Sequence, residues 1–316
     1  MRYKIKKEQS GTRLDLFLAG KDKAKSRSQI QRDIADGLVS VDGASRASHY
    51  ALKEGEVVET VKGRKENKKN KIDFDIRVVF ENDDFLVVDK PAGLIVHGAP
   101  HIKEATLADW LVAKYPKIEK VGEDELRPGI MHRLDKEASG LLVIAKNNET
   151  FFHLKKQFQD RLVEKRYLAL VYGSVSKDRD SIDFPLKRAS TGHRQAAVPS
   201  GWDDIEDAGS LKEALTEFDV LDRYVNHTLL SVRIKSGRKH QIRVHFYAYG
   251  NPLVGDDLYG TRTTKSLNKK MTLGRIFLVS CRLAFKDASG VHREFELEPP
   301  EELKAFLRSL PKKIPA

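Results

Sequence analysis

The sequence is poor in cysteine and has no long apolar run. Cys281 is its one cysteine, which excludes an intrachain disulfide and a zinc site with two or more thiolate ligands, and fits a reducing compartment. No stretch approaches the ~18 consecutive apolar residues of a membrane-spanning helix, and the basic start of the chain has no apolar signal core behind it. We therefore expect a cytoplasmic protein that does not enter a membrane.

Fingerprints of organic cofactors and metals are also missing. Neither the dinucleotide pattern G-x-G-x-x-G nor the P-loop pattern occurs, so no nucleotide cofactor is expected. His240 and His245 are five residues apart, not the four that place two ligands on one helix face, and we expect no metal site. No heptad repeat or long exposed apolar strip indicates association, and we expect a monomer.

Positive charge is abundant and unevenly distributed. The 316 residues include 57 Lys or Arg and 46 Asp or Glu, a net charge of +11 that makes RNA, DNA or an anionic membrane surface a plausible partner. Residues 1–72 contain 18 of the basic and 10 of the acidic residues, so most of the excess lies there. The length allows two domains. We expect an N-terminal module over 1–61, a basic linker over 62–72 and a nearly balanced body over 73–316.

The N-terminal module has a helix–helix–hairpin pattern. A short helix is predicted near 13–18, and a second from a Ser26 cap to about residue 36, with Ile30 and Ile34 on its buried face. Gly37 is placed to end that helix, and Leu38–Val41 reads as a strand followed by an Asp-Gly turn. The run SRSQIQRDIADGLVSVDG (26–43) resembles the alpha-L RNA-binding module of the ribosomal-protein S-four type. That resemblance implies that Lys25, Arg27 and Arg32 contact RNA phosphates.

Three segments of the body combine apolar strands with polar residues. The first is an apolar strand that runs into Lys90-Pro91, the second is HRLDKEASGLLVIAK (132–146), and the third is the basic turn SGRKHQIRVH (236–245). On the residues alone, Asp135 is either a turn residue or a carboxylate for nucleophilic or acid–base chemistry. The third segment follows an apolar strand and opens a helix, so it is either a plain basic turn or an anion site.

Taken together and in this order, the segments resemble the RluA-type family of pseudouridine synthases. The residues that carry the resemblance are KPAGLIVH (90–97), HRLDKEASGLLVIAK (132–146), KRYLALVYG (165–173), GRKHQIRVH (237–245) and NPLVGDDLYG (251–260). The resemblance covers about residues 73–300. It implies an α+β fold with a central, largely antiparallel mixed sheet, in which the HRLD loop faces the HQIR segment across an active-site cleft, preceded by the small α/β-hairpin RNA-binding domain. It also implies isomerisation of specific uridines to pseudouridine in structured RNA.

The resemblance assigns roles to individual residues. Asp135 is the catalytic aspartate, acting by covalent attack or as a base, and Arg243 is its ionic partner. Tyr167 is the aromatic residue against which the flipped base stacks. Two further positions complete the expected substrate contacts, with Arg133 filling the gap left by the flipped base and Ile242 forming a wall of the pocket. His132, at the head of the same HRLD motif, is grouped with these substrate-binding residues.

Some residues depart from the usual pattern, and alternatives remain open. Ala138 stands where relatives commonly have threonine, so a hydroxyl is lost beside the HRLD loop, and the polar stretch 261–270 is expected to be a mobile loop near RNA. Large-subunit ribosomal RNA is the expected substrate, with transfer RNA as the lesser alternative. The competing interpretations are a catalytically inactive RNA-binding or ribosome-assembly protein, and an RNA hydrolase that uses Asp135.

Overall fold

The computed structural model describes residues 1–22, 25, 27–61, 72–98, 102, 104–189, 194–198, 211–271 and 273–313, apart from the side chains of residues 28 and 32. The chain forms two compact units, Met1–Lys71 with Gly98–Glu104, and Ile72–His97 with Ala105–Ala316. The linker expected over 62–72 lies outside the described residues except for Ile72, which packs against the core of the second unit.

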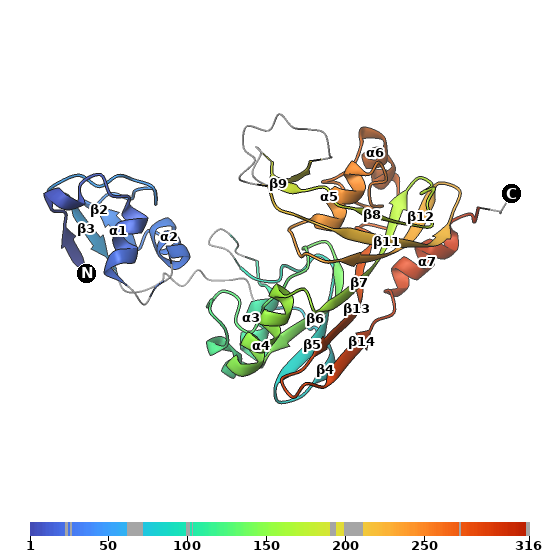
Figure 1. Cartoon of the computed structure of the whole chain (residues 1–316), viewed down its shortest axis with the longest axis horizontal. Helices are drawn as coiled ribbons and strands as arrows, with labels where there is room; N and C mark the ends of the chain where they lie inside the picture. Colours follow the sequence, from blue (N-terminus) through green and yellow to red (C-terminus); the bar gives the residue numbers. More distant parts are fainter. Residues whose placement is uncertain are drawn as a thin grey trace. The chain divides into compact units, whose positions relative to one another are not determined.

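The N-terminal unit is a three-stranded antiparallel sheet covered by two helices (Figure 1). Its elements are β1 (Arg2–Lys4), a 3-10 turn (Lys7–Gln9), α1 (Leu14–Lys21), α2 (Arg27–Ala35), β2 (Val39–Val41) and β3 (Val57–Thr60), with sheet order β1-β3-β2. Ile30 and Ile34 are buried in one core with residues of α1 and the strands, as their spacing predicts. Gly37 follows α2 with φ +73°, a conformation that glycine adopts without strain.

The second unit is built on one nine-stranded sheet. Its strands are β4 (Arg77–Glu81), β5 (Phe85–Lys90), β6 (Ser139–Ala145), β7 (Glu164–Tyr172), β8 (Arg179–Ile182), β11 (Thr216–Arg223), β12 (His227–Ile234), β13 (Leu278–Lys286) and β14 (His292–Glu296). They run in the order β4-β5-β6-β13-β7-β12-β11-β8, and β14 pairs with β13. Only the β6–β13 pair of this sheet, among the described residues, is parallel. The expected α+β fold with a largely antiparallel mixed sheet is confirmed.

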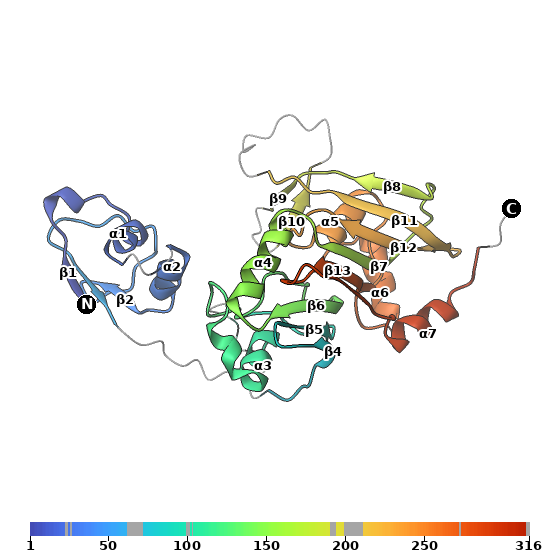
Figure 2. The same cartoon turned by 60° about the horizontal axis from the view of Figure 1, so that its bottom comes forward.

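Apolar side chains cover both faces of this sheet. Every residue of β6 is buried, because side chains from α3 (Leu107–Lys114) pack in the core on one face and Leu154 of α4 (Asn148–Gln159) packs in the core on the other. Both helices lie beside β5 and β6 in the two views of Figures 1 and 2. A strand covered on both faces reads as a continuous apolar run, which is why Leu141–Ala145 stands out in the sequence.

The remaining elements complete the unit, and one of them corrects an expectation. They are a 3-10 helix (Pro116–Lys120), the small pair β9 (Leu186–Arg188) and β10 (Gln195–Ala197), α5 (Gln241–Ala248), α6 (Arg262–Lys270) and α7 (Glu301–Ser309). The expectation of a mobile loop over 261–270 is wrong, because the segment forms α6. The side chain of Thr261 caps this helix at the backbone N–H of Thr264, and Asn268 Oδ1 accepts hydrogen bonds from the Gly255 N–H and the Tyr172 hydroxyl.

Two further findings concern burial and helix length. Cys281 lies on β13, and its side chain is half-buried. In the part of the chain that the structure describes, every helix is too short or too polar to cross a bilayer.

Candidate active site

The HRLD loop and the basic turn before α5 face each other across one cavity of about 550 Å³. Asp135 and its neighbours Met131–Leu134 line one side, Gly237–Ile242 line another, and Lys165 and Tyr167 of β7 complete the lining. This arrangement brings together the segments that the sequence predicts to meet, although 100 residues of chain separate them. Ile242 is buried in the cavity wall at 4 % exposure, in the position predicted for it.

The HRLD loop is fixed by its own histidine. His132 stacks on Phe158 of α4 with ring centroids 4.5 Å apart, and its Nε2 accepts a hydrogen bond from the Val143 N–H at 3.0 Å. Burial, aided by the positive charge of Lys165, lowers the pKa of His132 to about 3, so its ring is neutral at physiological pH. Although it lines the cavity, His132 holds the loop against β6, so the structure adds a positioning role to the substrate contact predicted for it.

Close backbone approach fixes the other end of the loop. Gly140, where β6 pairs with β13, has φ +113°, and a Cβ atom at this position would lie 2.3 Å from the carbonyl oxygen of Ser280. A larger residue there would push β6 away from β13. Glycine is therefore required at the point where the loop that carries Asp135 enters the sheet.

Arg243 is held rigidly beside Asp135. Its Nε and Nη2 donate to the two carboxylate oxygens of Asp256 at 2.7 and 2.9 Å, and its Nη1 donates to Glu137 at 2.9 Å. The same Nη1 lies 3.6 Å from Asp135 Oδ2. Burial alone would lower the pKa of the guanidinium, but its hydrogen bonds to Asp256 and the charges of the three carboxylates outweigh burial and raise that pKa. Arg243 is therefore a fixed positive charge next to Asp135.

Tyr167 presents a buried ring to the same cavity, with 6 % of its surface exposed. Burial, and after it the negative charge of Asp135, raises the pKa of the Tyr167 hydroxyl well above its usual value. The hydroxyl is therefore protonated at physiological pH. A neutral aromatic face beside a carboxylate can support a planar base by stacking, and its hydroxyl can donate a hydrogen bond.

Arg133 lies at the mouth of the cavity. Its side chain is exposed, and its Nη1 lies 3.1 Å from the Nε2 atom of His97. An exposed arginine adjacent to the cavity is placed where it can enter an RNA stack from which a base has been removed, in keeping with its predicted role.

Three residues that contact or fix this site were not recognised from the sequence. Lys90 is fully buried at the end of β5, where its Nζ donates to the carbonyls of Pro91, Leu94 and Lys136 at 2.8, 2.8 and 3.2 Å. Burial lowers its pKa to about 7, against the opposing charge of Asp135. Since Lys136 follows Asp135, Lys90 ties the catalytic loop to β5.

His240 and Asp256 are the other two site residues that were not recognised from the sequence. His240 adopts φ +56° immediately before α5, its Nδ1 lies 3.0 Å from the Tyr259 hydroxyl, and its Nε2 lies 3.9 Å from Asp135 Oδ1. Burial lowers the pKa of His240, and the charge of Asp135 opposes that change. Asp256 belongs to NPLVGDDLYG, so this run was available as a signal, but nothing in it shows which partner its carboxylates bind.

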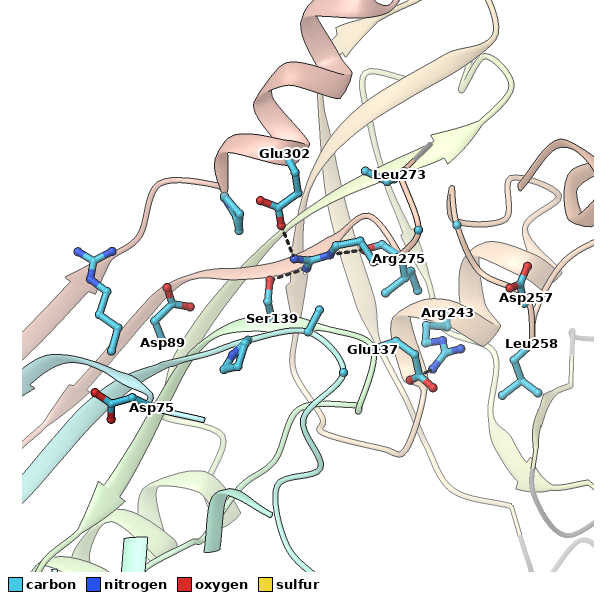
Figure 3. A pocket seen from close by; sticks show the side chains of 18 residues that line it. Asp75, Asp89, Glu137, Ser139, Arg243, Asp257, Leu258, Leu273, Arg275 and Glu302 are labelled. Carbon is cyan, nitrogen blue, oxygen red and sulfur yellow. Dashed lines mark hydrogen bonds and ion pairs between the residues drawn. The ribbon is translucent and has the colours of Figure 1, made fainter. Parts of the chain in front are cut away.

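A larger cavity of about 1000 Å³ lies on the other side of Arg243 and is lined by Glu137, Ser139 and Arg275 among others (Figure 3). Its central arginine is internally satisfied, because Arg275 donates to Ser139 at 2.6 Å and to Glu302 at 2.9 Å. Asp135 and Tyr167 line the smaller cavity, so that one is the candidate active site. Within the described ranges, no three His, Cys, Asp or Glu side chains gather as a metal ion would require.

The predicted RNA contacts of the N-terminal unit lie on and before α2. Lys25 Nζ forms an ion pair with Asp33 at 2.7 Å, and the Arg27 guanidinium donates to buried Asp15 at 3.0 and 3.1 Å. The side chain of Arg32 lies outside the described residues. Arg27 thus has a structural bond to α1, and about half of its side chain is exposed. Contact of these three residues with RNA stays a prediction.

Comparison with known proteins agrees with this geometry. A family model described as RNA pseudouridylate synthase matches residues 84–248, and an S4 domain model matches residues 12–58. An RNA pseudouridine synthase of Aquifex aeolicus is 38 % identical over 96 % of this chain and 95 % of its own length. A protein of Nitrosomonas europaea named ribosomal large subunit pseudouridine synthase D is 38 % identical over 79 % of this chain and 70 % of its own. The solved structure of human RNA pseudouridylate synthase domain containing 4 aligns with TM-score 0.60 and 21 % identity, covering 76 % of this chain and 94 % of that one.

Proposed function

Because this chain belongs to the RNA pseudouridylate synthase family and is an enzyme of that class acting on RNA, we propose that it modifies uridines of large-subunit ribosomal RNA and that Asp135 is its essential carboxylate. The observation that carries the assignment of Asp135 is its position in a cavity with Tyr167, with the guanidinium of Arg243 at 3.6 Å. No other described acidic side chain lines that cavity.

The reaction breaks the bond between C1′ of ribose and N1 of uracil, turns the base, and joins C1′ to C5 of the ring, from which a proton leaves. Asp135 acts either by covalent attack or as a base that assists elimination. Both roles require the carboxylate form, and the fixed positive charge of Arg243 at 3.6 Å orients it. Asp135 needs no metal ion or organic cofactor in either role.

The target uridine has to leave its stack to reach this cavity, at a cost of a few kcal/mol. Tyr167 offsets part of that cost by stacking on the base, which is worth about 1–3 kcal/mol. Arg133 occupies the vacated position in the RNA, and Ile242 closes the pocket from the side of α5. His132 keeps the HRLD loop in place during these steps.

Two observations support the proposed substrate class. Relatives from Nitrosomonas europaea and Pseudomonas aeruginosa carry the name ribosomal large subunit pseudouridine synthase D. An S4 domain precedes the catalytic unit, and such a module with its basic surface suits a large structured RNA. Transfer RNA is the second candidate because it is also a structured RNA from which an enzyme can flip a uridine.

Tritium release from RNA labelled at C5 of uracil tests both parts of the proposal. Unmodified 23S-type ribosomal RNA and bulk transfer RNA are compared with wild type, Asp135→Ala and Asp135→Asn. We expect release from ribosomal RNA with wild type and a loss of about 10⁴-fold or more with either variant, because a group that reacts with substrate has no substitute. Kd for RNA should change little.

Three outcomes contradict the proposal. Tritium release that survives in Asp135→Asn would remove the essential role of this carboxylate. Faster release from transfer RNA would assign the other substrate class. Strand scission of the RNA during incubation would indicate a hydrolase.

A further inference from the structure

Lys165 is an unpaired cation in the cavity of Asp135. It lies on β7 two residues before Tyr167, so both side chains point to the same face of the sheet, and both line the cavity. Among the described residues, no carboxylate lies within ion-pair distance of its Nζ and no group accepts a hydrogen bond from it. The buried Lys90 nearby shows the contrast, since its Nζ is satisfied by three carbonyls.

The surroundings of Lys165 hold its ammonium group in place without neutralising it. Its Nζ lies 5.5 Å from the centroid of the Phe158 ring, and 3.8 Å from where a Cβ atom of Gly237 would stand. Burial lowers the pKa of Lys165 to about 8, so the group is still largely protonated near pH 7. An ammonium group that is half-buried and has no protein acceptor is well placed to meet an acceptor that a ligand supplies.

The charge of the whole cavity indicates what that ligand is. Its lining includes six lysines or arginines against one acidic side chain, Asp135. Four of these cations lie against protein groups: Arg127 lies 3.5 Å from Asp124, Lys155 pairs with Glu123, Arg238 donates to the Glu213 carbonyl at 3.3 Å, and Arg133 Nη1 lies 3.1 Å from His97 Nε2. Lys165 has no such group within reach among the described residues, so its charge is available to the substrate.

We propose that Lys165, together with the adjoining turn Gly237–Lys239, forms a phosphodiester-binding subsite that grips the backbone of the nucleotide brought into the cavity. The proposal rests on RNA being the substrate. A phosphate carries a full negative charge, which a compact ammonium meets from any direction, whereas the carbonyls of uracil are neutral. Gly237 leaves room beside Nζ, where a side chain would occupy the place of the phosphate oxygens.

The subsite would hold the flipped nucleotide by its phosphate, in addition to the stacking of its base on Tyr167. Rotation of a nucleotide about its backbone moves the flanking phosphate toward the protein. A cation near Tyr167 and Asp135 then binds that phosphate while the base stacks. Lys165 therefore contributes to binding the substrate, and Asp135 to its chemistry.

The test uses the full-length enzyme with Lys165→Met, Lys165→Gln, Lys165→Arg and the control Lys156→Met. Lys156 is a neighbouring lysine on α4 that pairs with Asp160 at 2.9 Å and does not line the cavity. Direct RNA binding and KM are measured between 50 and 400 mM salt, and kcat at saturating RNA. We expect both neutral variants to weaken binding and raise KM about 10-fold or more, with a smaller effect on kcat.

The dependence of RNA binding on salt and pH distinguishes a phosphate contact by Lys165 from a purely structural role. Loss of one phosphate contact reduces the slope of log Kd against log salt by about 0.7–0.9. Lys165→Arg should restore the slope, and Lys156→Met should leave it unchanged. Wild-type binding should weaken as pH rises through about 8, where Lys165 loses its proton, and the neutral variants should lack this step. The other titratable or charged groups that line the cavity are present in every variant; they are His97, Arg127, His132, Arg133, Asp135, Lys155, Arg238, Lys239 and His240.

An unchanged salt slope in both neutral variants overturns the subsite. So does a fall in kcat with KM and slope unchanged, which would place Lys165 at the base or in the chemistry. Because the slope is measured by binding alone, failure of the subsite is distinguishable from failure of the proposed function, which would show as no tritium release by wild type.

Discussion

At the scale of single residues, the site depends on how tightly Arg243 is held. Asp256 is buried at 1 % exposure and accepts two hydrogen bonds from the guanidinium and two from the backbone N–H groups of Leu258 and Tyr259. Replacing one carboxylate oxygen by an amide nitrogen puts a donor against a donor. We expect Asp256→Asn to lower kcat about 100-fold, because a displacement of about 1 Å at a catalytic group costs that much, with a smaller change in KM.

The control for this prediction is the next residue. Asp257→Asn removes a carboxylate that, among the described residues, accepts a single hydrogen bond, from Asn268 at 3.3 Å, and kcat should stay within about threefold of wild type. Steady-state tritium release gives kcat for each variant, and thermal unfolding gives its melting temperature (Tm). Equal losses of kcat in both variants, or a Tm loss without a kcat loss in Asp256→Asn, would contradict the positioning role.

Sequence motifs located Asp135, Tyr167 and Arg243, but not the residues that hold or surround them. These three residues are recognised because the short motifs that contain them resemble those of a known family. Lys90 and Asp256 act through partners 46 and 13 residues away, and a buried lysine at the end of a strand has no local signature. Lys165 belongs to the motif KRYLALVYG (165–173). That its ammonium group has no carboxylate or hydrogen-bond acceptor beside it is visible only when the surrounding elements are in place.

At the scale of elements, buried Asp15 joins α1 to α2. Its carboxylate accepts hydrogen bonds from Arg13, Arg27 and Gln31. Burial would raise the pKa of Asp15, but these hydrogen bonds outweigh burial and hold it well below its usual range. A carboxyl with a lowered folded-state pKa stabilises the fold above its unfolded pKa near ~4, and this contribution declines as pH falls below that value.

We therefore expect Asp15→Asn to destabilise the N-terminal unit by about 2 kcal/mol between pH 5 and 8, since hydrogen bonds to charged groups contribute about that much. The difference from wild type should shrink below about pH 4. Hydrogen exchange of the α1 and α2 amides in the full chain measures it. Asp33→Asn, which removes the surface pair with Lys25, should cost under about 1 kcal/mol. A difference from wild type that persists unchanged to pH 3 would refute the linkage.

The same scale shows which elements a sequence predicts well. The helix expected to open in the segment 236–245 agrees with α5, which Gly250 follows. Helix α4 carries the same kind of signal, because apolar residues at helical spacing follow the capping residue Asn147. Helix α6 has no buried residue and therefore no such spacing, which is why it was expected to be a loop. It is helical because Thr261 caps it and Asn268 ties it to Gly255, and the second of these contacts depends on a tertiary neighbour.

At the scale of the whole molecule, the question is what the N-terminal unit adds to a catalytic unit that holds the entire candidate site. All residues assigned to the cavity lie in the second compact unit, and the first carries most of the excess positive charge. The division into a module over 1–61, a linker over 62–72 and a body over 73–316 remains our proposal. We propose that the first unit supplies affinity for structured RNA rather than chemistry.

Deletion of residues 1–71 tests this division of labour; the cut is placed before Ile72 because that side chain packs on the catalytic core. We expect kcat on a saturating RNA fragment to stay within about threefold of wild type, and Kd for ribosomal RNA to rise. If Lys25, Arg27 and Arg32 each meet a phosphate, the slope of log Kd against log salt should fall by about 2–3.

A matched variant keeps the whole chain and removes two of the three charges. The full-length protein with Lys25→Gln and Arg32→Gln should show about two-thirds of the decrease in slope that the deletion produces. Arg27 is left intact in this variant because it also binds Asp15. An unchanged salt slope in the truncated enzyme would refute the role given to this unit, and a collapse of kcat at saturating RNA would show that the first unit takes part in the reaction itself.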